Sequence, residues 1–481
     1  MHLYWVYLLI GSCNLGALEV PAGSRLSVRL TQTVASDLSK VEDAVHAVLA
    51  APVDLGRGFA IPARTVVEGR ILNAHSVGYG WRRERAALEI EFDALVLADG
   101  TRLSIEGKVI EVENAREKVN RQGSISGTLA AGAPHMIYNG RLRGLPVLNP
   151  LTDPILLIHK AVFPFFPQPE IRLPRGADLQ VRIAVPFEYP DEYLERLTEP
   201  RTELLEVLAD KPARILTKGG KDSDLINLAF AGTEDELVRA FQAAGWNEAH
   251  RANWRSVFRG MRDVFEQSFD PQAPMSRMLW DGRPPDFQFQ KSTNSYSKRH
   301  HVRIWRVGWM EDGTPLWAGA ATHDVQLKFA WRKLHFTHGI ASDIDAERRK
   351  IRDDLAFAGC VESSALLDRE MPGVLRNSDR TPMFTDGAVQ LLDLQTCRYR
   401  RIGSAAEHVS MTRADKPLLQ RYLRRQVLIL RNDILRANVF YGLGDLSRRL
   451  VRGIVNWNHQ RGVLAKRRGV ARKAEVASAL R

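Results

Sequence analysis

Residues 24–31 read SRLSVRLT, and this stretch decides the fold expected for the first part of the chain. Its apolar residues occupy every second position, which is the pattern of a strand with one buried face. The pattern Pro-x-Gly-x-x-Leu-x-Val-Arg at residues 21–29 returns at residues 174–182. Because a Pro-x-Gly turn leads into an extended strand both times, we expect the two copies to pair in one sheet. Residues 19–190 are therefore predicted to form one β-rich, barrel-like module.

Further strands are expected within this module. Residues 65–71, 87–97 and 103–112 have β character, and Ala98-Asp99-Gly100 forms the turn between the last two. A connector at residues 127–169 contains seven prolines. Proline at this density excludes a regular membrane helix. The connector is expected either to pack on the barrel or to touch a membrane as a loop.

The turns of this module carry a family resemblance. Pro21-Ala22-Gly23-Ser24 precedes a strand, residues 61–65 (IPART) precede Val67-x-Gly69, and residues 98–101 read ADGT. Together they resemble the β-barrel part of TrbI-type conjugative-transfer channel proteins. The resemblance implies a cell-envelope β-barrel used for assembly or binding, and no catalysis.

The charge of the chain is concentrated at its carboxyl end. The 481 residues carry a formal net charge of +12, and two or three domains are expected for this length. Residues 413–481 hold 17 Lys and Arg against 4 Asp and Glu, so the rest of the chain is close to neutral. Residues 412–481 are predicted to form a basic helical tail. Such amphipathic helices suit an anionic membrane surface or packing on a protein. The pattern does not favour nucleic-acid binding, because no aromatic stacking pattern accompanies the charge.

The amino terminus suggests export. Residues 3–10 (LYWVYLLI) are apolar but too few to span a bilayer, and small residues follow, so residues 1–18 are predicted to be a signal peptide. Cleavage after Ala17 competes with a lipobox at residues 10–13, in which Cys13 would be lipidated. A buried first strand is a third interpretation.

The chain has three cysteines, and no spacing among them is typical of a structural zinc site. Cys360 and Cys397 could pair in an oxidising compartment, but their spacing does not require it. Their pairing is left open at this point.

A second folded domain is expected over residues 205–400. Thr233-x-x-Glu236 is a capping box that opens a helix, and Ser342-x-x-Asp345 is expected to cap another. Strands are predicted at residues 302–310 and 316–329, with a turn at Asp312-Gly313. Helices and antiparallel strands alternate without βαβ regularity, so the class is α+β.

Ordered motifs over residues 213–395 characterise this domain more closely. They are Gly245-Trp246, Trp280-x-Gly282-Arg283, FQFQK at 287–291, RHHVRIW at 299–305, Trp317-x-Gly319-Ala320-Ala321 with Asp324, His338, and Asp343-x-Asp345-x-Glu347-Arg348. With these motifs the domain resembles the LssY carboxy-terminal domain, which is often attached to DedA-like or phosphatidic-acid-phosphatase-like membrane segments and carries a phosphatase-like label. The chain lacks the split phosphatase motifs of those segments.

The RHHVRIW strand is the centre of the candidate site. Alternation places Arg299, His301 and Arg303 on one face, roughly 7 Å apart at successive positions, and His300 on the other. Guanidinium groups and an imidazole so arranged suit a phosphate or carboxylate. The predicted anion-binding residues are Arg299, His300, Arg303 and Arg348.

Two chemistries are open at this site. His301, Asp324 and His338 are the candidate catalytic residues, with a histidine as general base or nucleophile. Alternatively, His301, His338, Asp324 and Asp343 hold a divalent metal of undetermined identity. A purely structural interpretation assigns Asp345 to the capping box, Asp343 and Glu347 to the helix dipole, His300 to the core, and Asp324 to an ion pair with Arg303.

These observations predict a multi-domain protein with an N-terminal β-barrel-like module, an α+β LssY-like domain and a basic α-helical tail. The expected location is the cell envelope, either periplasmic or membrane-associated. The leading function is binding, with possible hydrolysis, of an anionic or phosphorylated ligand or lipid head group. The alternative is a non-catalytic envelope scaffold, and nucleic-acid binding through the tail is third. The substrate and the oligomeric state are left open.

Overall fold

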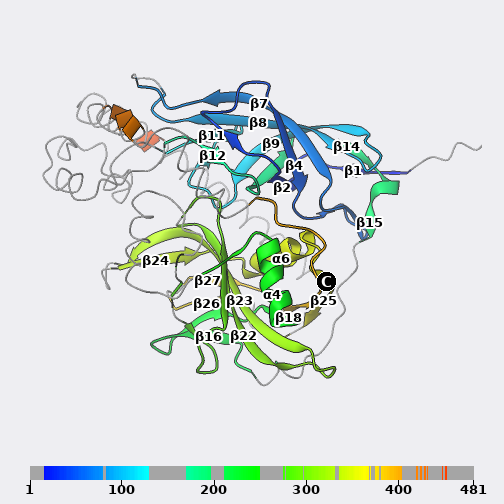
Figure 1. Cartoon of the computed structure of the whole chain (residues 1–481), viewed down its shortest axis with the longest axis vertical. Helices are drawn as coiled ribbons and strands as arrows, with labels where there is room; N and C mark the ends of the chain where they lie inside the picture. The colour runs from blue at the N-terminus through cyan, green and yellow to red at the C-terminus, as the bar shows by residue number, and fades with distance from the viewer. Residues whose placement is uncertain are drawn as a thin grey trace, which may run out of the picture. The chain divides into compact units, whose positions relative to one another are not determined.

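The computed structural model divides into two compact units, and the first comprises residues 1–77, 85–128 and 168–415. Figure 1 draws the strands of the amino-terminal module mostly in blue and cyan and those of the second domain mostly in green and yellow, and both belong to this first unit. Residues 1–15, with the apolar run and Cys13, lie outside the described part, as does most of the 127–169 connector. Side chains are described except at 327–330 and 335–338. The described residues are 16–79, 83–128, 169–196, 208, 211–249, 273, 275–276, 278–295, 297–330, 335–367, 369, 374–378, 381–403, 419–420, 423–424, 427–428, 431, 447 and 450–451.

Six antiparallel strands close into a barrel in the amino-terminal module. The ring runs β2-β4-β7-β8-β9-β13 and returns to β2, with β8 and β9 completing the circuit. The pairing of the two sequence copies is confirmed, since Leu26 lies opposite Val181 and Val28 opposite Leu179. The strands are β2 (Arg25–Leu30), β4 (Ala44–Leu49), β7 (Val66–His75), β8 (Ala87–Val96), β9 (Arg102–Val112) and β13 (Asp178–Ile183).

Glycines at two kinds of position make this barrel possible. Gly23 and Gly176, in the two Pro-x-Gly turns, have φ of +92° and +89°, a left-handed conformation that disfavours side chains. Gly69 lies where a Cβ atom would collide with the backbone of β8, so the strands approach closely there. The recurring turn is thus a backbone requirement of the fold.

Short strands flank the barrel. They are β1 (Ala17–Val20) with β14 (Phe187–Pro190), β3 (Val34–Ala35) with β12 (Arg172–Leu173), β5 (Val53–Asp54) with β6 (Phe59–Ile61) and β15 (Glu195–Arg196), and β10 (Lys118–Val119) with β11 (Ser124–Ser126). The 3-10 helix η1 (Asp191–Tyr193) follows β14.

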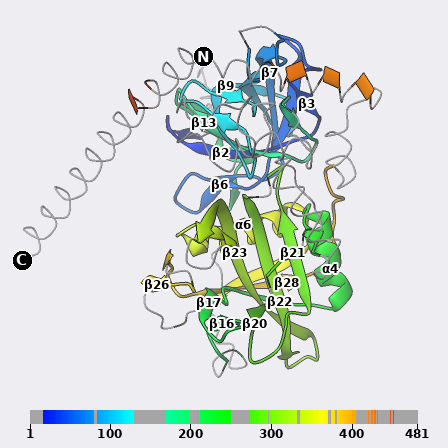
Figure 2. The ribbon, with the colours of Figure 1, turned by 90° about the vertical axis from the view of Figure 1, so that its left-hand side faces the viewer.

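The LssY-like domain is built on one large sheet, in which β22 and β23 are the long central arrows of Figure 2. The sheet order is β19-β21-β22-β23-β18-β28-β25, β24 also pairs with β23, and the β18–β28 pair alone is parallel. Its strands are β18 (Leu228–Ala231), β19 (Asn247–Glu248), β21 (Phe287–Lys291), β22 (Arg299–Trp309), β23 (Pro315–Ala330), β24 (His335–Ile340), β25 (Val361–Leu367) and β28 (Val389–Leu394). Smaller strands are β16 (Arg214–Thr217), β17 (Asp222–Leu225), β20 (Met278–Leu279), β26 (Val374–Arg376) and β27 (Pro382–Phe384).

Each face of this sheet carries a buried apolar cluster. One face packs against helices α4 (Glu234–Ala243) and α6 (Ile344–Phe357), where Phe241, Trp246 and Ile351 are buried. The other face buries Trp280 and Trp305. Two α-helices with defined bounds therefore accompany a mostly β structure in the described part of the domain.

The helix starts were predicted with mixed success. The capping box of α4 is confirmed, because Thr233 and Glu236 bond each other's backbone N–H groups. For α6 the predicted Ser342 cap is wrong: Asp343 is the N-cap and accepts from Ala346 N. The carboxylate of Asp345 instead accepts from Thr385 Oγ1 and Asp386 N, so it ties the helix to the β27–β28 loop.

The second unit comprises residues 78–84, 129–167 and 416–481. Helical residues are described at 419–420, 423–424, 427–428, 431, 447 and 450–451, and the rest of the predicted tail lies outside the described part. Among the described helices, none combines the length and apolar character that a membrane crossing requires.

Candidate functional site

Strand β22 separates the candidate site residues onto two faces, as alternation predicts. Arg299, His301 and Arg303 lie on one face and His300 on the other, and all four side chains are buried. The partner strand β23 supplies residues to both faces, since Arg299 pairs with Asp324 and His300 with His323. Directly opposed residues in a sheet share a face, so the register decides which groups meet.

The predicted anion clamp is engaged in internal contacts. Arg299 Nε lies 3.2 Å from Asp324 Oδ2, and its Nη1 donates to Gln290 Oε1 at 2.9 Å. His301 Nε2 lies 2.7 Å from Thr322 Oγ1, and its Nδ1 is 3.6 Å from Asp324. The structural interpretation paired Asp324 with Arg303. The register places Arg299 directly opposite Asp324, and these two form an ion pair, while Asp324 also acts electrostatically on Arg303.

Arg303 has a different partner, Asp224 at the end of β17. The atoms Nη1 and Oδ2 are 3.3 Å apart, and Arg303 Nη2 also donates to Ser276 Oγ at 3.1 Å. Burial raises the pKa of Asp224 and lowers that of Arg303, although each faces an opposite charge. A buried pair of this kind costs desolvation free energy, which its mutual attraction only partly returns.

The remaining predicted residues do not join this group. Arg348 Nη2 lies 2.6 Å from Asp386 Oδ2 and its Nη1 donates to Ala388 O, so it fastens α6 to the start of β28. Asp343 is exposed at the helix N-terminus beside Arg349. His338 lies on β24 opposite Leu327, and its side chain is outside the described part. The predicted metal set of His301, His338, Asp324 and Asp343 is therefore not brought together by the described side chains.

His300 instead joins the barrel to the LssY-like domain. Its Nε2 lies 2.7 Å from Glu113 Oε1, just after strand β9, and its Nδ1 lies 2.6 Å from Glu347 Oε2 on α6. Burial lowers the pKa of His300, but the two carboxylates outweigh it and raise the pKa to about 10. The imidazole is thus a cation that bridges the two modules at neutral pH.

His323 stacks on His300 and has the opposite character. The ring centroids are 4.3 Å apart, and His323 Nε2 lies 2.6 Å from Asn114 Oδ1 of the barrel module. Burial and the charge on His300 lower the pKa of His323 to about 3. His323 is therefore neutral beside a charged neighbour.

A larger ion network continues from Glu113 across the same interface. Arg29 of β2 bonds Asp178 of β13 at 2.6 Å and Asp354 of α6 at 2.7 Å. Lys291 Nζ and Lys350 Nζ each lie within 3.3 Å of both aspartates. We call these groups, with His300 and Glu347, the interface network. Its members are Arg29, Glu113, Asp178, Lys291, His300, Glu347, Lys350 and Asp354.

The interface network is balanced in charge, with four carboxylates and four cations when His300 is protonated. Burial raises the pKa of Asp178, but Arg29, Lys291 and Lys350 hold it well below its usual value. A cavity of about 30 Å³ adjoins Arg29, Asp178 and His300. This is room for only one or two water molecules.

Three partners of His300 were missed by sequence reasoning. Glu347 was assigned to the helix dipole, His323 to the apolar side of its strand, and Glu113 had no assigned role. The turn at Asp312-Gly313 predicts that the two strands pair, but it does not predict that His323 lies opposite His300, because a bulge between Arg306 and Gly308 shifts the register. Nothing local indicates that Glu113 would meet His300.

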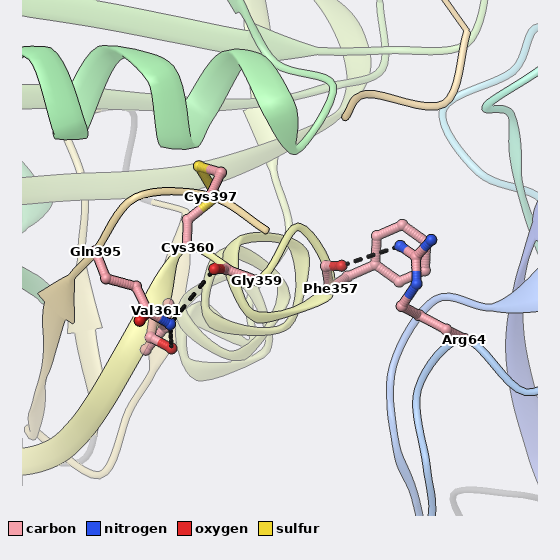
Figure 3. Close-up of a disulfide and its surroundings, with 7 residues drawn as sticks. All are labelled: Arg64, Phe357, Gly359, Cys360, Val361, Gln395 and Cys397. Carbon is pink, nitrogen blue, oxygen red and sulfur yellow. Dashed lines mark hydrogen bonds between the residues drawn. A yellow bond between two sulfur atoms is a disulfide. The ribbon is translucent and has the colours of Figure 1, made fainter. Parts of the chain in front are cut away.

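A further contact joins the modules at the end of α6. Arg64 Nη1 donates to Phe357 O at 3.3 Å and its guanidinium lies over the Phe357 ring, as Figure 3 shows. Nearby, Cys360 and Cys397 form a disulfide, and Gln395 Nε2 donates to Val361 O at 3.0 Å. The pairing that the sequence left open is thus present in the structure.

Comparison with known proteins assigns the second domain. Residues 208–389 match the family described as the LssY C-terminus, which confirms the resemblance drawn from the motifs. No curated protein matches the chain. Among solved structures, the chain is similar to ComB10 of the Com Type IV secretion system of Helicobacter pylori, at 11% identity over 38% of this chain and 98% of that chain. The TM-score is 0.21, so this likeness carries no argument about function.

Proposed function

We propose that this protein is a non-catalytic scaffold of the cell envelope, in which the barrel and the LssY-like domain act as one docking body. The observation that carries the proposal is the bridge from Glu113 through His300 to Glu347. Two residues of the LssY-like motif set, His300 of RHHVRIW and Glu347, form this bridge to the barrel, which supports a structural role for them.

The electrostatics of the domain favour the same interpretation. An anion site needs cations whose charge is not already compensated. Arg299, Arg303 and Arg348 each have a carboxylate partner, and the interface network is balanced. The adjoining cavity is too small for a phosphorylated metabolite.

An exported location is supported by two features. The apolar run at residues 3–10 has the length of a signal-peptide core. Cys360 and Cys397 form a disulfide, and disulfides persist mainly in oxidising compartments. The resemblance of the barrel turns to envelope channel proteins agrees with both.

The membrane is the partner proposed for the second unit. Leu419, Leu423 and Val427 recur at helical spacing and are 68%, 54% and 50% exposed. With Tyr79 they line an apolar hollow of about 420 Å³. An apolar stripe on a strongly basic segment fits an anionic bilayer surface. Sedimentation with phosphatidylglycerol vesicles, but not with phosphatidylcholine vesicles, is the expected result.

Two measurements on the full chain test the scaffold proposal. Cell fractionation combined with thiol alkylation should find the protein in the envelope with Cys360 and Cys397 protected. Incubation with a generic phosphoester, with and without Mg²⁺, Mn²⁺ or Zn²⁺, should give no turnover above that of buffer. Cytoplasmic protein with reduced cysteines would overturn the envelope assignment.

Binding, with possible hydrolysis, of an anionic ligand is the second candidate. Arg303 Nε and Arg348 Nε favour it, because both are buried and neither has a hydrogen-bond partner in the described part of the chain. Turnover that is lost in both His301→Ala and Arg303→Ala would establish this function in place of the scaffold.

A further inference from the structure

We infer that His300, His323 and Glu347 bind one divalent transition-metal ion. The inference goes beyond the proposed scaffold function, and it shares His300 and Glu347 with the bridge described above. One potential ligand atom from each of these residues lies within 4.8 Å of the others, and no other such group is found in the described part of the chain. The three residues come from β22, β23 and α6, so an ion here would tie two strands of the sheet to a helix.

Both imidazoles are oriented as metal ligands usually are. A ligating histidine commonly donates its second ring N–H to a carboxylate or amide oxygen, which fixes the tautomer. Nε2 of His300 faces Glu113 Oε1 at 2.7 Å, and Nε2 of His323 faces Asn114 Oδ1 at 2.6 Å. Since both Nε2 atoms face acceptors outside the cluster, each ring would bind a metal through Nδ1. In the metal-free structure His300 Nδ1 lies 2.6 Å from Glu347 Oε2, so an ion would replace the proton held between these two atoms.

Glu347 supplies the third ligand. Its side chain is 2% exposed and lies 2.6 Å from His300 Nδ1 through Oε2. The second oxygen, Oε1, is buried without a hydrogen-bond partner among the described residues. A buried carboxylate oxygen without a partner costs free energy, and a bound cation would satisfy it.

The spacing and the charge of the cluster suit a small divalent ion. Ligand atoms at about 2.0 Å from a tetrahedral zinc ion lie about 3.3 Å from one another. This spacing falls between the 2.6 Å that separate His300 Nδ1 from Glu347 Oε2 and the 4.8 Å within which all three ligand atoms lie. With both imidazoles neutral, the interface network holds four carboxylates against three cations, a net negative charge. Two imidazoles and one carboxylate favour zinc or cobalt over calcium or magnesium.

The surroundings point to a structural ion. A catalytic metal keeps an open position that substrate can reach. Here the adjoining cavity of about 30 Å³ admits water alone. The oxygen atoms that orient both histidines belong to residues 113 and 114 of the barrel module, so metal affinity should depend on the barrel.

The test uses the untagged full chain, stripped with a chelator and titrated with Zn²⁺ by calorimetry and with Co²⁺ by visible absorption. We expect one ion per chain, a cobalt spectrum of nitrogen and oxygen ligation without thiolate bands, and a higher Tm with zinc. His323→Gln should weaken binding by more than tenfold. Asn114→Ala removes only an orienting group and should weaken it about 10- to 100-fold.

His46→Gln is the matched control, because His46 is a half-exposed histidine on β4 outside the cluster. It should bind zinc like the natural chain. The inference is overturned if the natural chain binds no stoichiometric zinc and gains no Tm. It is equally overturned if His323→Gln and Glu347→Gln, both folded by circular dichroism, bind as tightly as the natural chain. If either variant does not fold, Asn114→Ala is titrated in its place, and zinc binding as tight as that of the natural chain overturns the inference.

Discussion

Arg29 of strand β2 and Asp354 of helix α6 form a buried ion pair, Nη2 to Oδ1 at 2.7 Å, although 325 residues separate them. Asp354 is shared further, since its Oδ2 accepts from Trp246 Nε1 at 3.0 Å and from Lys291 Nζ at 2.9 Å. One carboxylate of α6 thus links the barrel to the segment that follows α4 and to strand β21. The modules are joined by charged groups that are expensive to separate from one another once buried.

Asp354→Asn should destabilise the protein strongly. The variant leaves Arg29, Lys291 and Lys350 without one of their shared counter-charges, and breaking a buried network costs about 3–5 kcal/mol. The free energy of unfolding in urea measures the loss. Asp235→Asn is the control, because the Asp235–Arg239 pair is about 70% exposed and such pairs contribute under about 1 kcal/mol. Equal effects of the two variants would contradict the buried network.

Acid should destabilise the natural chain through the same aspartates. Arg29, Lys291 and Lys350 outweigh burial and hold the pKa of Asp178 and of Asp354 below the usual value. A carboxyl group with a lowered folded-state pKa contributes stability that is complete above its unfolded pKa, about 3.9, and is lost as the pH falls toward the folded pKa. The free energy of unfolding should therefore drop between pH 5 and pH 3. Asp354→Asn should show a shallower drop, and Asp235→Asn the natural one.

A double-mutant cycle on Arg303 and Asp224 separates a structural role from ligand binding. Arg303→Met leaves a buried carboxylate without its guanidinium and should cost about 3 kcal/mol or more. Arg303→Met combined with Asp224→Asn should cost less than the sum of the two single changes, by at least about 1 kcal/mol. Unfolding measurements with and without phosphate complete the cycle. If phosphate stabilises the natural chain and Arg303→Met abolishes that stabilisation, the result would support an anion site instead.

Much of the fold follows from local sequence rules. The Pro-x-Gly turns and the alternation after them predicted the pairing of β2 with β13, which the register confirms. The Thr233 capping box predicted the start of α4. These features succeed because turn geometry and side-chain period are properties of a few neighbouring residues.

The candidate site was harder to predict, because its partners are distant in sequence. Arg29 stands on the polar side of an alternating strand, and alternation alone assigns it to solvent. It is 3% exposed because the LssY-like domain covers that side of the barrel. Glu113 and Asp178 were missed for the same reason. Asp324 was placed with Arg303, but it pairs with Arg299; the bulge between Arg306 and Gly308 shifts the register by one residue, without which Asp324 would lie opposite His300.

Removal of the disulfide should lower stability without affecting the interface network. Cys360 and Cys397 close a loop with a sequence separation of 37, for which restriction of the unfolded chain predicts about 3–4 kcal/mol. Cys360→Ser with Cys397→Ser should lose roughly this free energy of unfolding, and reductant should destabilise the natural chain to the same level. The double variant itself should be indifferent to reductant, which controls for other effects of the reagent. If reductant leaves the natural chain unchanged while alkylation finds both thiols free, the bond is absent and the export argument loses its structural support.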